Sequence, residues 1–357
     1  DVDLARINYD SNGDNGHILL EPTSTNLLPY SEDFSEWTSS NATLESGYAA
    51  PDGSANAYKV TGTVGSSAVY FAGVSNLSST STRTIWAKTV SGTGQAHLCS
   101  FNGNTNNLKT ITNEWQRFEV NGTTTSTGQA NFYAIDFRGS TDLTEIILWG
   151  AQAENLSYAT SYIPTLTGST VTRATETLTG SGNSTLINST EGVLYAEIAM
   201  LSEDDKASNN QLFLNDGTSL QRVGIFTESA GDIRVQIRDN DEATDIRNLT
   251  ALDQSQSGVD VAAFNKIAIQ YKSGENKLFV NGSRITDTNF DSMVFNFSSL
   301  DNLDFDSGAN SNYFRGKCKA LAVFNEALED DELELLTGVT NYGSFGELAS
   351  ANGYTII

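Results

Sequence analysis

The amino-acid sequence predicts an all-β protein made of two consecutive antiparallel β-sandwiches, with one short helix near the C-terminus. Short segments of alternating apolar residues recur along the chain, and Gly, Asn and Ser turns separate them. Charged residues make up only 18% of the sequence; Ser, Thr, Asn and Gly are correspondingly abundant, which favours strands and turns over helices. The 357 residues suffice for two domains of ordinary size.

The first series of predicted strands lies in a domain expected to span residues 23–165. Its members alternate apolar and polar residues and end at turn-forming residues. They are 57–64, 67–74, 83–90, 95–101, 115–122, 130–139 and 145–152. Residues 1–22 are polar and turn-rich, and we expect them to form an N-terminal extension or a linker to another region.

The second series lies in a domain expected to span residues 189–338, after a connection at 166–188 that is thin in large apolar residues. Its predicted strands are 192–200, 211–216, 222–227, 232–239, 265–272, 277–285, 300–305 and 318–325. A helix is predicted over 325–336, because Leu328, Leu333 and Leu336 follow helical spacing and acidic residues crowd its first turn. Residues 339–357 are expected to form a C-terminal tail.

The charge and the apolar pattern exclude several classes of partner. A formal net charge of −24 repels phosphate, so neither nucleic acid nor an anionic membrane surface is an expected partner. No window approaches 18 consecutive apolar residues, and membrane insertion is not expected. Cys99 and Cys318 lie far apart in the sequence and are interpreted as small buried apolar residues rather than as a disulfide.

Two segments of each domain resemble known sandwich families. In the second domain, FNKIAIQYKSGENKLFVNGSRI and YFRGKCKALAVFNEALEDDELELL resemble the paired strands, closing strand and short helix of the laminin G-like, or concanavalin A-like, family. In the first domain, NLLPYSEDFSEW and TEIILWGAQAEN are similar to the opening and closing strands of jelly-roll carbohydrate-binding modules. The resemblance implies a jelly roll followed by a laminin G-like sandwich, which are folds that host many functions.

The opening segment of the first domain is expected to be a strand that begins the sandwich. Leu27 and Leu28 start it, and Pro29 stands at an edge where a missing N–H is tolerated. Phe34 and Trp37 are predicted to anchor the core.

The combination of segments also resembles bacteriophage virion proteins, namely tail-fibre, receptor-binding and capsid-fibre chains. The stretch LLEPTSTNLLPYSEDFSEW occurs together with ILWGAQAEN, ATSYIPT, TRA and a closing YGSF, GELA and YTI. This resemblance implies a virion-surface protein that binds a host cell-surface glycan, contacts other virion proteins and forms a homo-oligomer, with a trimer as our expectation. The alternatives are a secreted or surface-attached bacterial carbohydrate-binding protein, a polysaccharide-degrading module, and a purely structural virion component.

Catalysis is not predicted. Glu329, Asp331 and Glu334 fit the E-x-D-x-x-E formula of laminarinase-type glycosidases. That chemistry needs a strand that directs alternate carboxylates into one cleft, whereas this stretch is predicted to be helical, and helix positions i and i+2 do not share a face. The only two histidines, His17 and His97, lie in no metal-ligand spacing.

Sugar binding requires aromatic platforms, and all four tryptophans lie in the first domain. The sequence nominates Trp86 and Trp149, in predicted strands, with Tyr58 and Tyr70 as further candidates. Core packing is the alternative interpretation of each of these side chains. Trp115, which follows a turn, is interpreted as a lid on the core.

A structural Ca²⁺ ion is a further hypothesis, since Ca²⁺ takes carboxylate, amide and carbonyl oxygens. Candidate ligands are Glu32 or Asp33 with Glu154, where the first and last strands of the first domain would meet. Two acidic loops of the second domain add candidates, which are Asp239, Asp241, Asp245, Asp301, Asp304 and Asp306. The alternative is that these acids cap turns or face solvent.

Overall fold

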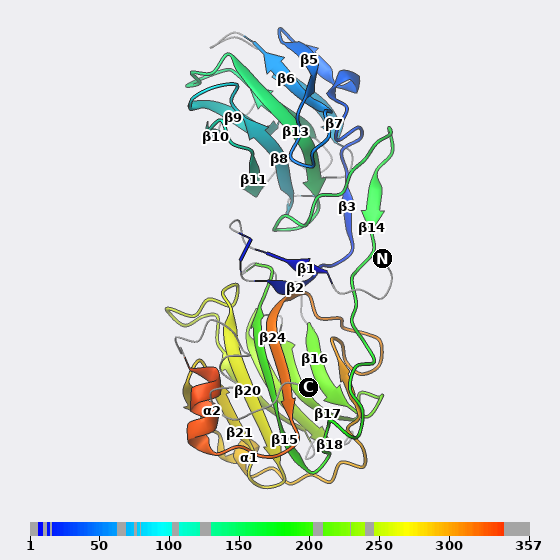
Figure 1. The fold of residues 1–357 in the computed structure, drawn as a ribbon, viewed down its shortest axis with the longest axis vertical. Helices are drawn as coiled ribbons and strands as arrows, with labels where there is room; N and C mark the ends of the chain where they lie inside the picture. The colour runs from blue at the N-terminus through cyan, green and yellow to red at the C-terminus, as the bar shows by residue number, and fades with distance from the viewer. Residues whose placement is uncertain are drawn as a thin grey trace. The chain divides into compact units, whose positions relative to one another are not determined.

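A computed structural model of the chain describes its fold over most of the sequence (Figure 1). The described residues are 6–9, 13–14, 16–62, 69–74, 77–78, 80–101, 107–121, 130–202, 210–228, 230–239 and 246–338. The chain divides into two compact units. We call Thr23–Thr175 the N-terminal sandwich, and Asp1–Pro22 together with Glu176–Ile357 the C-terminal sandwich. The predicted tail at 339–357 lies outside the described residues.

The N-terminal sandwich contains two five-stranded antiparallel sheets. The β10–β4 sheet consists, in spatial order, of β10 (Leu108–Ile111), β9 (Gly94–Phe101), β12 (Ala130–Asp136), β7 (Val69–Val74) and β4 (Thr38–Ser40). The β11–β5 sheet consists of β11 (Gln116–Asn121), β8 (Thr82–Lys88), β13 (Glu145–Glu154), β6 (Ala57–Thr61) and β5 (Thr43–Tyr48). A separate pair joins β3 (Ser24–Asn26) to β14 (Val171–Arg173).

The opening segment of this sandwich differs from the prediction of a strand. Between β3 and β4 the chain forms only a short 3₁₀ helix, η1 (Phe34–Glu36), which Asp33 caps. The anchoring role is confirmed, because Phe34 and Trp37 are buried in the core with their ring centroids 4.7 Å apart. The indole nitrogen of Trp37 donates to the carbonyl of Pro29 at 3.2 Å. Aromatic packing, the indole hydrogen bond and backbone hydrogen bonds to residues 151–153 and 165–167 therefore hold this segment, although it forms no regular strand.

The C-terminal sandwich packs a seven-stranded sheet against a five-stranded one. The larger sheet consists of β1 (Ile7–Asn8), β2 (His17–Leu20), β24 (Gly316–Phe324), β15 (Glu191–Ala199), β20 (Asn265–Lys272), β21 (Lys277–Val280) and β22 (Ser283–Ile285). The smaller, called the β19–β23 sheet, consists of β19 (Ile246–Leu252), β18 (Ile233–Asp239), β17 (Gln221–Thr227), β16 (Gln211–Asn215) and β23 (Asn302–Asp304). A single-turn helix, α1 (Thr288–Asp291), follows β22.

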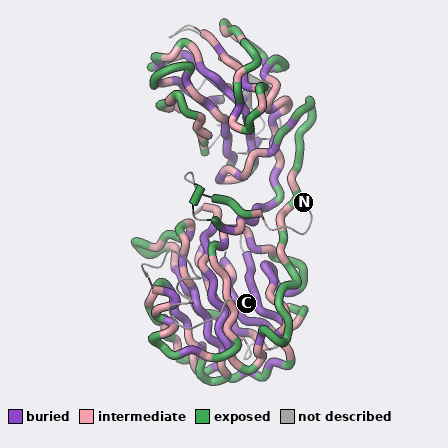
Figure 2. The backbone as a smooth tube through the Cα atoms, in the orientation of Figure 1, coloured by how far each residue is buried: buried purple, intermediate pink, exposed green. Residues whose placement is uncertain are grey.

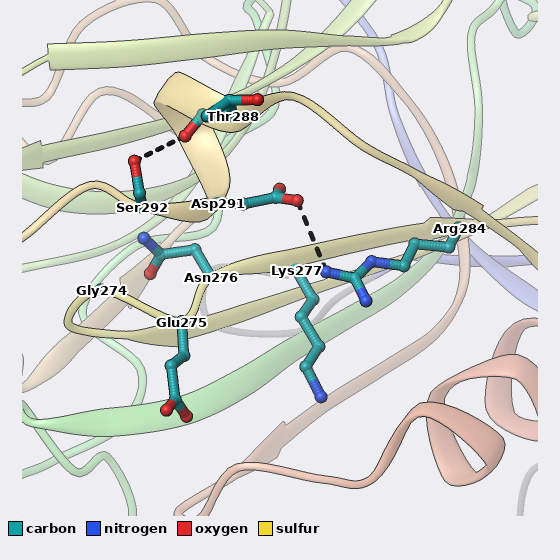
Figure 3. A pocket seen from close by; sticks show the side chains of 8 residues that line it. All are labelled: Gly274, Glu275, Asn276, Lys277, Arg284, Thr288, Asp291 and Ser292. Atoms are coloured by element: carbon teal, nitrogen blue, oxygen red, sulfur yellow. Dashed lines mark hydrogen bonds and ion pairs between the residues drawn. The ribbon is translucent and has the colours of Figure 1, made fainter.

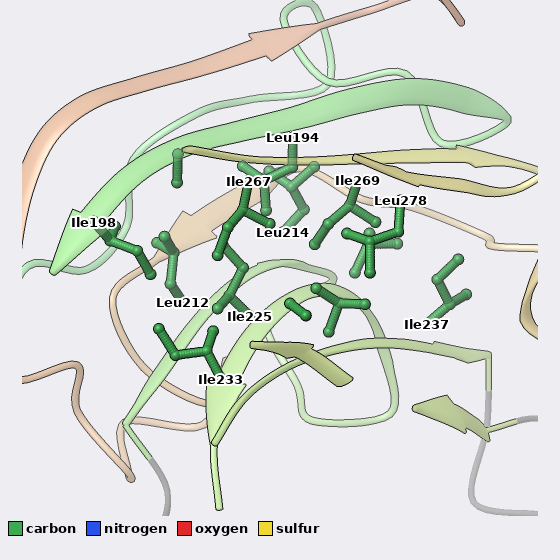
Figure 4. Packing of buried hydrophobic residues seen from close by; sticks show 14 of the residues in the cluster. Leu194, Ile198, Leu212, Leu214, Ile225, Ile233, Ile237, Ile267, Ile269 and Leu278 are labelled. Carbon is green, nitrogen blue, oxygen red and sulfur yellow. The ribbon is translucent and has the colours of Figure 1, made fainter. Parts of the chain in front are cut away.

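The core of the C-terminal sandwich lies between its two sheets. Leu194 and Ile267 of the larger sheet point toward Leu212 and Ile225 of the smaller one (Figure 4). In each sandwich the strands carry most of the buried residues and the turns most of the exposed ones (Figure 2). The all-β prediction of antiparallel sandwiches is thus confirmed.

The N-terminal residues belong to the second sandwich rather than to an extension. β2 pairs with β24, so that Ile18 lies opposite Cys318. The backbone N–H of Glu176 donates to the carbonyl of Glu21 at 3.0 Å, where the chain returns to this unit. One four-residue strand within a polar segment gives almost no periodic signal, which explains why the sequence did not predict it.

The predicted C-terminal helix is present as α2 (Asp330–Thr337) and begins a few residues later than expected. A capping box between Glu329 and Glu332 sets its start. Leu333 and Leu336 are buried with Tyr195 against the outer face of the seven-stranded sheet. Neither α1 nor α2, the helices of the described chain, is long and apolar enough to cross a membrane.

A buried histidine gives the N-terminal sandwich a pH dependence. His97 of β9 is 3% exposed, and burial lowers its pKa, an effect that the charge of Asp136 opposes and that of Arg138 strengthens. The unfolded chain therefore takes up this proton at a higher pH than the folded one. The contribution of His97 to stability is complete above about pH 6.5 and is lost as pH falls toward the lower folded pKa.

We expect His97→Gln to reduce the loss of thermal stability on acidification. The change removes the titrating group from both the folded and the unfolded state. Melting of the N-terminal sandwich, followed by tryptophan fluorescence from about pH 8 to about pH 5, measures the effect. Parallel pH profiles for the variant and the parent chain would contradict it.

Candidate functional site

The strongest candidate site is the outer face of the β11–β5 sheet, which points away from the core of the N-terminal sandwich. Strand alternation creates this face. Ile146 and Leu148 of β13 pack in the core, so Ile147 and Trp149 point to the opposite side, where a separate cluster forms. The sequence singled out Trp86 and Trp149 without placing them together. In the structure they are directly paired across β8 and β13, on the same face.

Strand register aligns two adjacent rows of side chains across this face. Arg117 is paired with Trp86, Trp86 with Trp149, and Ala57 with Tyr48. Ile147 is paired with both Lys88 and Lys59, and Lys59 with Glu45. We define the aromatic face by these side chains and by Trp115 and Tyr162, which pack against the same cluster.

A β-bulge at Gly150 brings the aromatic rings together. Trp149 opposes Trp86 and Gln152 opposes Thr84, so two residues of β13 share one position on β8. Gly150 adopts a φ of +62°, which L-residues rarely take. A Cβ there would lie 3.1 Å from Cδ1 of Trp86 and 3.5 Å from Cζ of Tyr162. Only glycine satisfies the backbone and leaves the rings in place.

Trp149 acts as a support rather than as a platform. It is 5% exposed, and its indole nitrogen donates to Oδ1 of Asn56 at 2.9 Å. Its ring centroid lies 4.9 Å from that of Tyr162, whose hydroxyl hydrogen-bonds Oγ of Ser31 at 2.6 Å. Burial raises the pKa of Tyr162, which keeps the hydroxyl protonated. Trp149 is therefore fixed by partners within the protein.

Trp86 differs from Trp149 in both exposure and bonding. Its ring is half-buried at the centre of the face. Its indole nitrogen is buried and finds no acceptor among the described residues. Because an unpaired buried donor costs free energy, stability alone does not account for a tryptophan at this position.

Three cationic side chains surround the rings. Nζ of Lys88 lies 5.3 Å from the centroid of Trp115, close enough for a cation–π interaction. Nζ of Lys59 is 2.7 Å from a carboxylate oxygen of Glu45, and this bond raises the pKa of Lys59. Arg117 donates to the carbonyl of Thr160 at 2.8 Å, which orients its guanidinium beside Trp86.

The two tyrosine candidates do not join this face. Tyr58 follows Ala57 in β6, so its ring packs on the core side, 5.7 Å from Phe34. Its hydroxyl donates to Oδ1 of Asp33 at 2.8 Å. Tyr70 lies in β7, in the other sheet, and its side chain is outside the described residues. Tyr58 therefore has a structural role.

Protein donors bind the predicted calcium ligands of the N-terminal sandwich. Glu32 accepts from Asn56 Nδ2 at 2.8 Å. Asp33 accepts from Ser35, and this side-chain bond lowers the pKa of Asp33. Glu154 is fully buried, and its donors are Ser24 Oγ at 2.6 Å, Gln152 Nε2 at 2.6 Å, and the hydroxyl and backbone N–H of Thr160.

Two of the predicted calcium ligands in the C-terminal sandwich also accept hydrogen bonds from the protein. Asp304 accepts from Asn215 Nδ2 at 2.8 Å and from the backbone of Gly180. Asp306 accepts from the backbone N–H of Gly308 at 2.5 Å, and burial, with a smaller effect of Asp304, raises its pKa. In the part of the chain that the structure describes, no three His, Cys, Asp or Glu side chains are grouped to hold a metal. Asp241 and Asp245 lie outside that part.

A pocket of about 390 Å³ in the C-terminal sandwich is a weaker candidate (Figure 3). Its lining residues are Gly274, Glu275, Asn276, Lys277, Arg284, Thr288, Asp291 and Ser292. Both cations are already paired, Lys277 with Asp330 at 2.5 Å, and Arg284 with Asp330 at 3.0 Å and Asp291 at 3.4 Å. An anionic ligand would have to compete with these carboxylates.

The glycosidase-like formula falls on a helix. Asp331 and Glu334 lie in α2 and Glu329 is its N-cap, so the three carboxylates do not project from one strand. This agrees with the interpretation of EDDELE from the sequence. The geometry that retaining glycosidases need is absent from this segment.

Sequence reasoning missed the partners of Trp86. Trp115 was interpreted as a lid on the core, but it is half-buried on the aromatic face. Tyr48 and Tyr162 carry no local signal, because β5 is weakly apolar and Tyr162 lies outside any strand. Once the register of β8 and β11 is known, the alternation of side chains along each strand places Lys88 and Arg117 on the same face.

Comparisons with known proteins give fold-level likenesses. No family model and no curated protein matches the chain. Among solved structures, the Ruminococcus gnavus IT-sialidase CBM40 is 21% identical, covering 46% of this chain and 97% of that one, with a TM-score of 0.35. The leech intramolecular trans-sialidase is 22% identical over 43% and 24% of the chains, with a TM-score of 0.32. The receptor-binding domain of botulinum neurotoxin C/D mosaic serotype is 13% identical over 41% and 35%, with a TM-score of 0.30. Likenesses this weak do not indicate what the present chain binds.

Proposed function

We propose that the chain is a glycan-binding protein and that the aromatic face of the N-terminal sandwich is its binding site. The observation that carries this proposal is the clustering of half-buried Trp86, Trp115 and Tyr48 on one sheet face, among Lys59, Lys88 and Arg117. Aromatic rings stack on the apolar C–H faces of sugars, and neighbouring cations hydrogen-bond the hydroxyl groups.

The arrangement favours a binding role over a stabilising one. Within the aromatic face, Trp149 and Tyr162 pack against each other, and both have polar partners. Trp86, in contrast, has a partly exposed ring and an indole nitrogen that finds no acceptor among the described residues. A bound sugar would cover the ring and bring hydroxyl oxygens to this edge of the cluster. The sheet supplies the rigid backbone that such a platform requires.

The experiment is a glycan-array screen of the full chain, followed by titration of the best-bound oligosaccharide. We expect Trp86→Ala and Trp115→Ala each to weaken binding at least roughly tenfold, since each removes about 1.4 kcal/mol or more of stacking. The control is Tyr9→Ala, which removes an exposed aromatic side chain from the C-terminal sandwich.

Two outcomes would count against the proposal. The array shows no binding, or both tryptophan variants bind as tightly as the parent chain while their circular dichroism is unchanged. If a tryptophan variant loses binding because it is partly unfolded, Lys88→Gln provides a second test of the same face. This change leaves the rings in place and removes the charge above Trp115.

We further propose that the chain serves in adhesion on a virion surface, as part of a tail or capsid fibre and as a homotrimer. The resemblance of residues 19–37 and 147–155 to phage virion proteins supports this assignment. A secreted bacterial carbohydrate-binding protein would use the same face, and imaging of the native assembly would separate the two. A purely structural component would bind no glycan, and a polysaccharide-degrading module would release reducing ends.

A further inference from the structure

The pocket of the C-terminal sandwich is formed by the turn between β20 and β21, by β22 and by α1 (Figure 3). Its volume of about 390 Å³ falls within the range of about 300–1,000 Å³ that is usual for small-molecule sites. Buried Asn276 donates from Nδ2 to the carbonyls of Phe290 at 3.0 Å and Met293 at 2.9 Å. The backbone N–H of Gly274 donates to the carbonyl of Met293 at 2.8 Å. These bonds hold the turn against the helix, so the pocket is preformed.

Ion pairs position the two cations of the pocket. Asp330, the first residue of α2, lies 2.5 Å from Nζ of Lys277 and 3.0 Å from Nη1 of Arg284. The bond to Lys277 lowers the pKa of Asp330, which keeps this carboxylate ionised. A lysine has three N–H donors and an arginine five, which is more than these ion pairs use. The spare donors of both cations have no acceptor among the described residues.

Asp291 is a carboxylate whose hydrogen bonding is incomplete. Its Oδ2 accepts one long bond, at 3.4 Å from Nη2 of Arg284, and its buried Oδ1 finds no donor in the described part of the chain. A buried acceptor without a donor costs free energy. Because the terminal torsion of aspartate is broad, a small rotation turns Oδ1 toward the pocket that Asp291 lines. A ligand that brings a hydroxyl donor would remove this cost.

The lining of the pocket favours a neutral ligand. Its two carboxylates and two cations cancel in formal charge, and Asp330 beside the cations adds a further negative charge. An anion would have to displace carboxylates, and a cation would meet Lys277 and Arg284. Among the described residues that line the pocket none is aromatic, so a planar aromatic ligand would find no stacking partner. The remaining class is a compound whose groups both donate and accept, as hydroxyl groups do.

An exposed apolar side chain lies beside the pocket. Val294 is 76% exposed. A Cβ at Gly274, which lines the pocket, would lie 4.0 Å from Cγ2 of Val294. A sugar ring has an apolar C–H face as well as hydroxyl groups, so it matches a polar pocket with an apolar side chain next to it.

We propose that this pocket binds one ring of a neutral saccharide, with Asp291 accepting from one hydroxyl group and Lys277 and Arg284 donating to others. Val294 would contact the C–H face of the ring. Hydrogen bonds with a charged partner are stronger than neutral ones, and side chains already held by ion pairs lose little freedom on binding. This second sugar site lies in the C-terminal sandwich and does not depend on the aromatic face.

The test is calorimetric titration of the full chain with five neutral trisaccharides, which are maltotriose, cellotriose, galactotriose, mannotriose and chitotriose. We expect at least one of them to bind at the pocket. Asp291→Ala and Arg284→Gln should each weaken that binding at least about tenfold. Trp86→Ala, on the aromatic face, should leave it unchanged.

Three controls separate folding, occupancy and charge. Glu228→Ala removes the carboxylate of another surface ion pair of the same sandwich, that with Arg234, and should leave binding unchanged. Thr288→Trp fills the pocket from an exposed position without touching the ion pairs, so it should abolish binding even where Asp291→Ala is partly unfolded. A uronic-acid counterpart of the best probe should bind more weakly, because Asp291 and Asp330 repel its carboxylate.

The proposal fails if none of the five probes binds, or if every probe that binds does so equally well to the parent chain and to folded Thr288→Trp. Tighter binding of the uronic acid, lost in Arg284→Gln, would make the pocket an anion site and also overturn the inference. Binding that Trp86→Ala abolishes and Thr288→Trp does not belongs to the aromatic face. Failure of this proposal is therefore distinguishable from failure of the proposed function.

Discussion

Replacing Glu154 with Ala is expected to lower the free energy of unfolding of the N-terminal sandwich by roughly 3–5 kcal/mol. The carboxylate is fully buried and accepts from Ser24, Gln152 and Thr160, which lie on three different segments. Without it, several buried donors lose their acceptor at once. Glu154→Gln retains one acceptor oxygen and should cost less, about 1–2 kcal/mol.

All four tryptophans lie in the N-terminal sandwich, so tryptophan fluorescence during denaturant unfolding reports on this unit within the full chain. Glu145→Ala is the matched control, because it removes a half-buried carboxylate at the start of the same strand. It should change the free energy of unfolding by no more than about 0.5 kcal/mol. Equal effects of the two alanine changes would show that the hydrogen bonds of Glu154 contribute little.

The same measurement examines the calcium hypothesis. Protein donors bind Glu32, Asp33 and Glu154, so we expect neither added Ca²⁺ nor a chelator to shift this unfolding transition. A rise in the midpoint with Ca²⁺ that Glu154→Gln abolishes would restore Glu154 as a ligand.

Gly150→Ala is expected to destabilise the N-terminal sandwich by about 1–2 kcal/mol and to weaken glycan binding as well. The left-handed backbone at this position disfavours any Cβ, and the added atom would lie 3.1 Å from the ring of Trp86. Relief of that contact requires Trp86 to move from its place beside Trp149. The change therefore tests whether the bulge positions the aromatic face.

Gly92→Ala provides the control for backbone strain. Gly92 has a φ of +66°, close to the +62° of Gly150, and a Cβ there would meet nothing within 4 Å. We expect a similar loss of stability from strain but unchanged glycan affinity. If both variants bind as the parent chain does, the bulge does not determine the position of the platform.

Most strands were predictable because they rely on local pattern. Segments 265–272 and 145–152 are short and rich in β-branched and aromatic residues, and β20 (Asn265–Lys272) and β13 (Glu145–Glu154) match them closely. β1, β2 and β14 have two to four residues each, so their stability comes from the strands they pair with rather than from their own residues. For the opening segment 26–37 the sequence predicts a strand, which the structure does not show, but it predicts the core residues Phe34 and Trp37 correctly.

The candidate sites depend on register, which no single segment contains. The sequence nominated Trp86 and Trp149 as aromatic residues in strands. Only the pairing of β8 with β13 shows that they share a face and that Trp149 is the buried support.

The sequence by itself determined the all-β class, most of the strands, the C-terminal helix, and the core roles of Phe34 and Trp37. Alternation, turn residues and aromatic anchors act over a few residues, so they can be detected locally. The tertiary structure decided which sandwich holds residues 6–22, which acids are saturated by donors, and which rings and cations converge. These properties depend on ladder register and burial, which bring together residues far apart in the chain.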